Sequence, residues 1–289
     1  MLSKKIGWIG AGKMGLPICK RLKSAGHDVC VLARKPEQAA LLNVLGFHTE
    51  NTVSTLIKNA DIVFTAVTDD QALSSIVLNE TFVPALPASS IFIDISTVSP
   101  QVSRQIASHL PKDNAYLRAP VSGSTAMAES GTLTTMVSGP QSAFEAISDI
   151  FAAYTKKAFY LGEDEEARFL KLAINSMVAA TSALLGEALA FGAKGGLTND
   201  KMLEVFNQSA VASPLMGYKT DMIVKGDYKA AASLAMLKKD LDLLLSASTT
   251  PLPLNAHIHQ IYQSAMAKGL GEEDFFVLVR EAQMAGATS

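Results

Sequence analysis

Cysteine is scarce in this sequence, and its scarcity excludes two classes of protein. The 289 residues include two cysteines, Cys19 and Cys30, with no CxxC pair and no second cysteine cluster. Neither a zinc site nor a disulfide-bonded scaffold is therefore predicted. Both cysteines fall in predicted regular elements, where a free cysteine behaves as a small buried hydrophobic residue. Unpaired thiols are typical of a reducing compartment, so we expect a cytoplasmic protein.

An excess of charge of one sign is also lacking. Lysine and arginine number 25 against 27 acidic residues, which gives a net charge of -2. This balance provides no general attraction to nucleic acid or to an anionic membrane. Residues 1–10 enter a strand-like run at once, without an apolar segment and cleavage site, so no secretory signal is expected. HExxH, GxSxG and paired-carboxylate signatures are missing as well, and no metal site is predicted.

One segment, residues 170–193, is long and apolar enough to suggest a membrane span. It is interrupted by polar or small residues: Lys171, Asn175, Ser176, Thr181, Ser182, Gly186 and Glu187. Such a composition is too polar for lipid, and we expect a central helix of a globular protein instead. Lys171 and Asn175 are four residues apart, which puts both on one face of that helix. A lysine in this setting has either a structural partner or a chemical task.

A glycine-rich turn follows the first predicted strand, residues 5–10. Its sequence is Gly10-Ala11-Gly12-Lys13-Met14-Gly15. A helical pattern up to Gly26 and a second strand over 29–33 come next, and this arrangement is typical of dinucleotide binding. Gly10 permits the tight turn, Gly12 permits close approach of a pyrophosphate, and Gly15 permits close packing of helix and strand. The alternative is a glycine-rich turn without a ligand.

The residues after the second strand indicate which dinucleotide would bind. NAD-preferring folds usually have a carboxylate there that holds the ribose 2′-hydroxyl. This sequence has Arg34 and Lys35 instead. Two cations can bind a 2′-phosphate, so NADP(H) is favoured over NAD(H). A solvated basic pair at a strand end is the alternative.

The alternation of strands and helices continues through the N-terminal half. Strands are predicted over 61–67, 91–95, 115–119, 133–137 and 158–161, with helices over 69–78, from Pro100, and over 141–153. This alternation predicts an open, mostly parallel sheet. Ligands of such sheets lie beyond the carboxyl ends of the strands. Three loops follow strand ends: Val67-Thr68, Ser96-Thr97 and residues 120–124. The last one offers hydroxyl and backbone N–H groups to a small carboxylate or hydroxyl compound, although an ordinary turn is an equal alternative.

Strand signals stop after Gly162, and the second half is predicted to be all-helical. The acidic residues 163–166 favour a helix start, and the long helix runs to about Lys194. Further helices are predicted over 199–208, 214–224, 233–248, 254–268 and 272–284. By itself, the charged sequence around Lys239 is best interpreted as a solvated cluster.

Six motifs in order make the sequence resemble the β-hydroxyacid dehydrogenase family, which includes 3-hydroxyisobutyrate dehydrogenase, tartronate semialdehyde reductase and glyoxylate/succinic semialdehyde reductase. They are IGWIGAGKMG at 6–15, DISTVSP at 94–100, APVSGS at 119–124, KLAIN at 171–175, LKKDLDL at 237–243 and GLGEEDF at 269–275. The resemblance covers nearly the whole chain. It implies an α/β Rossmann domain over 1–163 and an all-α domain over 164–289, which includes an inter-domain helix over 164–194. It also implies a homodimer or homotetramer.

The resemblance further implies roles for individual residues. Lys171 would be the catalytic residue and Asn175 its neighbour at the substrate. Substrate binding is implied for the loop Ser122, Gly123 and Ser124. Cofactor contacts are implied for Val67, Thr68, Thr97 and Lys239, which would replace the solvated interpretation of Lys239.

The implied reaction is hydride transfer between NADP(H) and a small 3-hydroxy acid or semialdehyde acid. Hydride arriving at a carbonyl carbon leaves negative charge on oxygen, which an ammonium can stabilise and protonate. Burial lowers the pKa of a lysine, which suits acid–base work near neutral pH. An imine reductase with the same domain plan and a non-catalytic NADP-binding protein are the alternatives.

Several residues depart from the family pattern. Asp is usual where this chain has Arg118, and Gly is common at the positions of Ser124, Glu165 and Ala167. A Phe that usually precedes the KDL motif is absent from residues 230–236. These departures concern the substrate pocket rather than the class of reaction.

Overall fold

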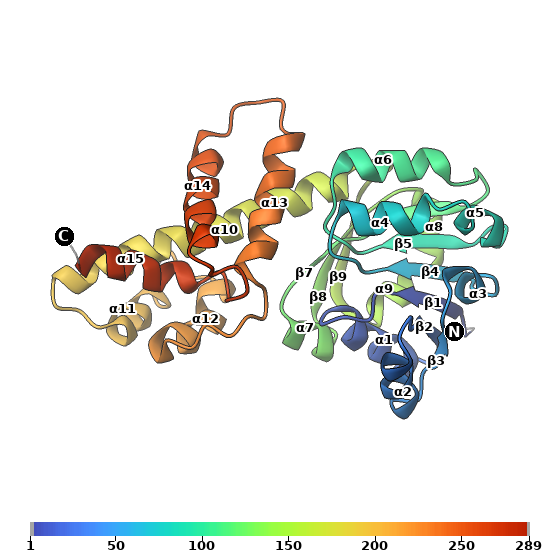
Figure 1. Ribbon diagram of the computed structural model, residues 1–289, viewed down its shortest axis with the longest axis horizontal. Coiled ribbons are helices and arrows are strands. Elements are labelled where there is room, and N and C mark those ends of the chain that lie inside the picture. Colours follow the sequence, from blue (N-terminus) through green and yellow to red (C-terminus); the bar gives the residue numbers. More distant parts are fainter. Residues whose placement is uncertain (1–2, 288–289) are drawn as a thin grey trace. The chain divides into compact units, whose positions relative to one another are not determined.

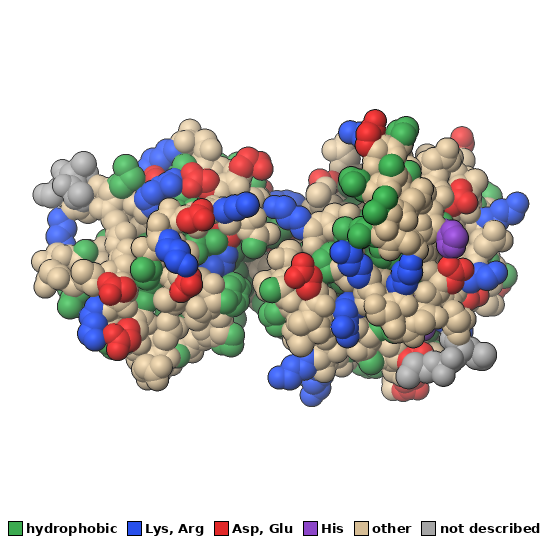
Figure 2. Space-filling model, turned by 90° about the horizontal axis from the view of Figure 1, so that it is seen from below, with side chains coloured by type: hydrophobic (Ala, Val, Ile, Leu, Met, Phe, Trp, Pro, Cys, Tyr) green, Lys and Arg blue, Asp and Glu red, His purple; other side chains and the backbone are tan. Residues whose placement is uncertain are grey.

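The computed structural model describes residues 3–287, and the chain divides into two compact units at Lys171–Leu172 (Figure 1). We call them the sheet unit and the helical unit. The division falls inside one long helix, whereas the sequence predicted a domain boundary at 163/164. Acidic and basic side chains are interspersed over both units on the face that Figure 2 shows.

The sheet unit contains a nine-stranded sheet with the order β3-β2-β1-β4-β5-β6-β8-β7, in which β9 also pairs with β8. Its strands are β1 (Lys5–Ile9), β2 (Asp28–Leu32), β3 (His48–Glu50), β4 (Ile62–Thr65), β5 (Ile91–Asp94), β6 (Ala115–Arg118), β7 (Val121–Ser122), β8 (Leu133–Ser138) and β9 (Thr155–Gly162). The first six are parallel, β8 runs antiparallel to β6 and β7, and β9 runs parallel to β8. The predicted mostly parallel sheet is confirmed.

Helices cover both faces of this sheet. They are α1 (Gly15–Ser24), α2 (Pro36–Val44), α3 (Val53–Ile57), α4 (Asp70–Val77), α5 (Phe82–Ala85), α6 (Pro100–His109), α7 (Thr125–Ser130), α8 (Gln141–Ala146) and α9 (Ser148–Ala152). Successive strand residues point to opposite faces. Along β4, Ile62 and Phe64 join the core cluster that includes α1, while Val63 joins the one that includes α4. The sheet is therefore buried on both faces, as parallel sheets are.

The helical unit is all-α, as predicted. Its helices are α10 (Glu166–Lys194), which begins in the sheet unit, α11 (Asn199–Phe206), α12 (Pro214–Lys225), α13 (Leu234–Ala247), α14 (Pro253–Ala267) and α15 (Val277–Ala287). Ser213 and Ser233 cap α12 and α13 through their side chains. Leu189, Leu203, Leu237 and Phe276 belong to its core cluster.

Helix α10 is long and apolar enough to cross a membrane by length and composition, and 44% of its most apolar window is buried within the protein. Core helices of water-soluble proteins share this composition. Its first turns carry the buried side chains of Arg168, Lys171 and Asn175.

Several element boundaries differ from those predicted. The helix predicted over 141–153 is two short helices, because Ile147 leaves helical geometry. The last helix begins at Val277 rather than 272, because Asp274 accepts hydrogen bonds from Lys219 and from the backbone N–H of Phe276 in a turn. The predicted loop over 120–124 contains strand β7. The elements α2, β3, α3, α5 and α7 were not predicted. Cys19 is buried as expected, while Cys30 is half-buried.

Candidate active site

The loops predicted to bind the cofactor follow strands that are aligned at their ends. Ile9 of β1 pairs with Thr65 of β4, and Thr65 pairs with Asp94 of β5. Parallel strands that end in register place their following loops at one edge of the sheet. Gly10, the Val67-Thr68 pair and Thr97 therefore start from the same carboxyl edge of the sheet unit.

The glycine turn has the steric features that a pyrophosphate site needs. A Cβ on Gly10 would lie 2.1 Å from the carbonyl oxygen of Ala66, and its φ is +100°. A Cβ on Gly15 would lie 2.2 Å from the carbonyl oxygen of Gly10, so this glycine permits the close packing of α1. Gly12 is different, because a Cβ there would have no described protein atom within 4 Å. The space beside Gly12 is open, as expected of a position that faces a ligand.

The remaining residues of the glycine turn bear on whether an anion could bind at the amino end of α1. Ala11 and Met14 pack against the sheet core, and Lys13 is exposed. Met14 provides no side-chain cap for α1, and the first turn of α1 carries no acidic residue. The amino end of a helix attracts anions through its N–H groups and its dipole. A dinucleotide pyrophosphate fits these residues.

Arg34 and Lys35 are exposed directly after β2. Lys35 is the N-cap residue of α2, with Pro36 in the first turn. Both cationic groups lie at the carboxyl edge of the strand next to β1, where the ribose of a dinucleotide is placed in this fold.

The loops predicted to bind the cofactor are held by a carboxylate that sequence reasoning missed. Asp94, at the end of β5, accepts hydrogen bonds from Thr65 Oγ1 at 2.7 Å and from Ser96 Oγ at 2.6 Å. Ser96 Oγ in turn accepts the N–H of Val67 at 2.9 Å. Thr68 Oγ1 donates to Asp69, the residue that caps α4. This network fixes the loops after β4 and β5 to each other.

A second missed residue, Arg168 in the first turn of α10, completes this network. Its Nη2 donates to Asp94 Oδ2 at 2.5 Å and to Tyr116 Oη at 2.9 Å. Its Nη1 donates to the carbonyl oxygen of Ser96 at 2.6 Å. Burial lowers the pKa of Arg168, but Tyr116 and Asp94 raise it by more, so the guanidinium stays charged. Burial also raises the pKa of Tyr116, which stays a neutral phenol.

Two of the departures from the family pattern contact each other. Arg118, at the end of β6, donates from Nε and Nη2 to the same oxygen of Glu165, Oε1, at 3.0 and 2.6 Å. Both side chains are buried, and Glu165 Oε2 has no hydrogen-bond partner among the described residues. A third departure, Ala167, is also buried, and its N–H donates to Ser138 Oγ. Arg118, Glu165 and Ala167 therefore all take part in contacts at the beginning of α10.

The residues of the predicted substrate loop contact β8 and α7. Ser122 is half-buried in β7 and pairs with Thr134 of β8. Gly123 has a φ of +138°, and a Cβ there would lie 2.7 Å from Leu133. Ser124 Oγ caps α7 by accepting the N–H of Met127. Their roles in substrate binding stay predictions.

Lys171 and Asn175 are both 8% exposed on α10. Lys171 belongs to the sheet unit, and Asn175 to the helical unit. In the helical unit, Asn175 Nδ2 donates to Asp240 Oδ2 at 2.5 Å, and Lys239 Nζ lies 2.9 Å from Asp240 Oδ1. Asp240 is buried, so the KDL motif is more than a solvated charge cluster.

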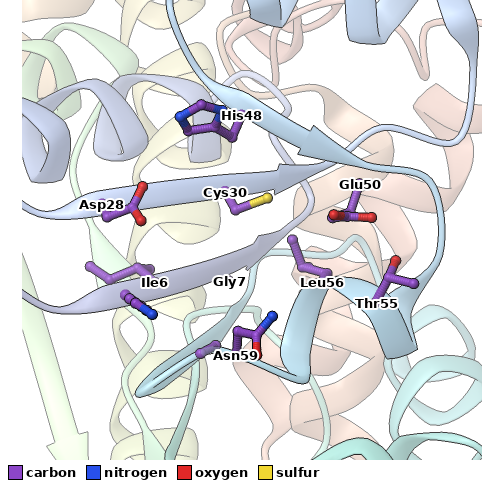
Figure 3. A pocket seen from close by; sticks show the side chains of 11 residues that line it. Ile6, Gly7, Asp28, Cys30, His48, Glu50, Thr55, Leu56 and Asn59 are labelled. Carbon is purple, nitrogen blue, oxygen red and sulfur yellow. The ribbon is translucent and has the colours of Figure 1, made fainter.

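A cavity of about 380 Å³ lies elsewhere in the sheet unit and contains none of the predicted site residues (Figure 3). Residues of β1, β2, β3 and α3 line it, including Asp28, Cys30, His48 and Glu50. Burial and the negative charges of Glu50 and Asp28 raise the pKa of Cys30 to about 11. Within residues 3–287, no three His, Cys, Asp or Glu side chains form a group that could hold a metal ion.

Comparison with known proteins matches both units. The family model described as the NAD binding domain of 6-phosphogluconate dehydrogenase matches residues 5–162. The one described as NAD-binding of NADP-dependent 3-hydroxyisobutyrate dehydrogenase matches residues 166–282. A solved structure of 3-hydroxyisobutyrate dehydrogenase from Mycobacterium tuberculosis with L-serine has a TM-score of 0.86 and 24% identity, and the match covers 97% of this chain and 99% of that one. That likeness shows the fold.

Sequence relatives are of two kinds. Cytokine-like nuclear factor N-PAC from Xenopus tropicalis is 29% identical over 282 residues, and the match covers 96% of this chain but 53% of the relative. This chain thus spans about half the length of such relatives. 2-(Hydroxymethyl)glutarate dehydrogenase from Eubacterium barkeri is 31% identical, and the match covers 99% of this chain and 97% of the relative. With both units matched and a full-length relative above 30% identity, the chain belongs to the β-hydroxyacid dehydrogenase family.

Proposed function

We propose that the protein is an NADP(H)-dependent oxidoreductase that interconverts a small 3-hydroxy acid and the corresponding semialdehyde acid. The observation that carries the proposal is the burial of Lys171 in the sheet unit. This lysine lies near the start of α10, in the same unit as the open glycine turn and the loops after β4 and β5. Family membership supports the class of reaction.

A nicotinamide held by the glycine turn and the loops after β4 and β5 would supply or accept the hydride. Lys171 acts at the substrate oxygen. As an ammonium it donates a hydrogen bond to the carbonyl oxygen, stabilises the negative charge that develops there, and gives up its proton. In the oxidative direction the neutral amine removes the proton of the hydroxyl group. Ser122 and the backbone N–H groups around Gly123 offer donors for the substrate carboxylate. The family resemblance gives Asn175 a role at the substrate and Lys239 a role at the cofactor.

The chain's own groups also account for the choice of cofactor. The amino end of α1 and the open side of Gly12 receive the pyrophosphate. Arg34 and Lys35 pair with a ribose 2′-phosphate, for which the planar guanidinium is suited to bidentate contact. We also propose a cytoplasmic location.

A screen of NADPH oxidation would identify the substrate. Glyoxylate, succinic semialdehyde, tartronate semialdehyde and cyclic imines cover the open possibilities. Turnover of a carboxyl-bearing aldehyde supports the proposal. Turnover of a cyclic imine with no activity on these aldehydes would assign the chain to imine reductases instead.

The role of Lys171 is tested with Lys171→Ala on the substrate that the screen finds. General acid–base catalysis contributes about 10²- to 10⁴-fold, so we expect kcat to fall by that factor. Lys201→Ala, which removes an exposed lysine of α11, is the matched control and should keep wild-type turnover. Wild-type kcat in Lys171→Ala would refute the mechanism.

Cofactor preference has a separate test in Arg34→Ala. Loss of a charged contact to the 2′-phosphate costs about 1.5–3 kcal/mol, so kcat/KM for NADPH should fall about 10- to 150-fold. The value for NADH should stay unchanged. Arg104→Ala, at an exposed position on α6, is the control. Equal use of both cofactors by the wild-type protein would remove the role given to Arg34 and Lys35.

A second candidate, a protein that binds NADP(H) without catalysis, is favoured by one observation. Relatives named as nuclear factors match nearly all of this chain. Retention of Lys171 and Asn175 argues for the enzyme. Tight NADPH binding, measured by calorimetry, together with no turnover in the screen would reverse this ranking.

A further inference from the structure

Two buried guanidinium–carboxylate pairs attach the beginning of α10 to the sheet. Arg168–Asp94 and Arg118–Glu165 have N–O distances of 2.5 and 2.6 Å, and all four side chains are at most 6% exposed. One arginine is on the helix and the other on a strand. Both pairs join residues 165–168 to the carboxyl ends of β5 and β6.

The contacts of Arg168 determine its position in several directions. Its guanidinium donates to side chains of β5, β6 and α6 and to the backbone after β5: Asp94, Tyr116, Ser103 and Ser96. A guanidinium is planar and its donors have fixed directions, so contacts with three elements and a loop restrict both the place and the orientation of the side chain. The first turn of α10 is thereby held at one angle to the sheet edge.

The second pair fixes the residue before the helix. Arg118 holds Glu165 Oε1 with two donors, while Glu165 Oε2 has no hydrogen-bond partner in the part of the chain that the structure describes. Leaving one buried carboxylate oxygen unpaired is unfavourable. A buried ion pair also gains little stability over apolar residues of similar volume. This arrangement therefore suits a positional role better than a stabilising one.

Lys171 is the residue whose position these contacts would control. It follows Arg168 by three residues, so the two side chains are neighbours on the helix surface. Both belong to the sheet unit, and both are buried. A helix is stiff over one turn, so a change in the direction of its first turn moves the Lys171 ammonium relative to the loops after β4, β5 and β6. Displacement of a reacting group by about 1 Å can cost about 100-fold in rate.

We propose that Arg168 and the Arg118–Glu165 pair are positioning residues for Lys171. They hold the first turn of α10 against the ends of β5 and β6, so that the ammonium group of Lys171 meets the substrate oxygen. The inference rests on the proposed function. It assigns no direct contact with substrate to either arginine.

The test removes the second pair without leaving a lone buried charge. In the double variant Arg118→Met/Glu165→Leu we expect the fold to be kept, kcat to fall at least tenfold, and KM for NADPH to stay within about twofold. The matched control is Arg280→Met/Glu273→Leu, which removes a partly exposed pair of the helical unit with N–O distances of 2.9 and 3.0 Å. It should keep wild-type kcat.

Arg168→Lys tests the same idea at the other pair. It keeps a positive charge beside Asp94 but loses the planar group that donates to four residues. We expect an intermediate loss of kcat, smaller than that of Arg168→Met. This graded rescue is not expected of a residue that only stabilises the fold.

A readout independent of turnover is the rate at which Lys171 is acetylated by acetic anhydride, measured by peptide mass spectrometry. The buried side chain should react slowly in the wild-type protein and faster in both Arg118→Met/Glu165→Leu and Arg168→Met. The proposal is overturned if the folded double variant keeps wild-type kcat and acetylation rate, or if the control variant changes them equally. Wild-type turnover in Lys171→Ala would instead refute the proposed function, while faster acetylation would still report the positional effect.

Discussion

Both units bury ion pairs, but they place them differently. In the sheet unit, Arg168–Asp94 and Arg118–Glu165 lie at the carboxyl ends of β5 and β6, beside the loops predicted to bind ligands. In the helical unit, Lys219 of α12 pairs with Asp274 at 2.5 Å, against the rings of Phe275 and Phe276. Those two phenylalanines belong to the apolar core of that unit. Buried ion pairs therefore lie beside the proposed site in one unit and against the apolar core in the other.

The largest effect is expected from breaking the pair that serves the fold. Lys219→Met leaves the carboxylate of Asp274 buried without its cation, which costs about 3–5 kcal/mol. Unfolding by urea can be followed by circular dichroism at 222 nm, which reports mainly on helices. Lys225→Met removes an exposed i,i+4 pair of the same helix and should change stability by at most about 0.5 kcal/mol.

Trp8 allows the two units to be compared in that experiment. It is the single tryptophan of the chain, and it is buried in β1 against Phe64. Its fluorescence therefore reports on the sheet unit. We expect Lys219→Met to lower the midpoint of the circular dichroism transition more than that of the fluorescence transition. Equal shifts in both would show that the two units unfold together as one cooperative unit.

The next largest effect on stability is expected in the glycine turn. Two of its glycines differ, because Gly10 is needed for the fold and Gly12 is proposed to face the cofactor. Gly10→Ala puts a Cβ against the Ala66 carbonyl at a positive φ, and strain of this kind costs about 1–3 kcal/mol. The fluorescence transition of Trp8 should report the loss, because Trp8 Nε1 donates to the Gly10 carbonyl. Gly12→Ala has no described protein neighbour to disturb.

Gly12→Ala should therefore keep the stability of the sheet unit and weaken NADPH binding, because its methyl group enters the space proposed for the pyrophosphate. Calorimetric titration with NADPH measures the affinity. A Gly12→Ala protein that unfolds early, or one that binds NADPH as tightly as the wild type, would show that Gly12 does not face the cofactor.

These contrasts also explain what the sequence could predict. The alternation of strands and helices and the glycine turn are local patterns, so the mostly parallel sheet and the loops at its edge followed from them. The role of Arg168 could not be predicted because its partners lie on strands and a helix that are distant in the sequence. No local sequence pattern indicates that an arginine is buried. Arg118 and Glu165 were visible as departures from the family pattern, but their pairing needs the three-dimensional structure. The start of α15 depends on Asp274 and Lys219, which are likewise distant in sequence.

Substitutions on the surface of the helical unit should have a smaller effect on stability but should change the mass of the oligomer. Met177, Leu184 and Phe191 recur every seven residues along α10 and are 72%, 69% and 83% exposed. The family resemblance predicts a homodimer or homotetramer, and an apolar stripe of this spacing suits helix packing. Leu184→Glu/Phe191→Glu should lower the mass measured by light scattering and leave unfolding nearly unchanged. Met284→Glu, at an exposed position on α15, is the control. A wild-type monomer would contradict the prediction.

The smallest effect is expected at the cavity beside Cys30, which contrasts with the glycine turn at the other end of β1. Cys30→Ser should leave kcat/KM within about twofold, because none of the predicted site residues lines that cavity. Its thiol should also react slowly with Ellman's reagent at pH 7, since a pKa raised to about 11 leaves little thiolate. Reactivity should rise as the pH approaches 11. Rapid labelling at pH 7 that is lost in Cys30→Ser would contradict the raised pKa of this thiol. A large loss of NADPH binding in that variant would mean that the cavity takes part in ligand binding.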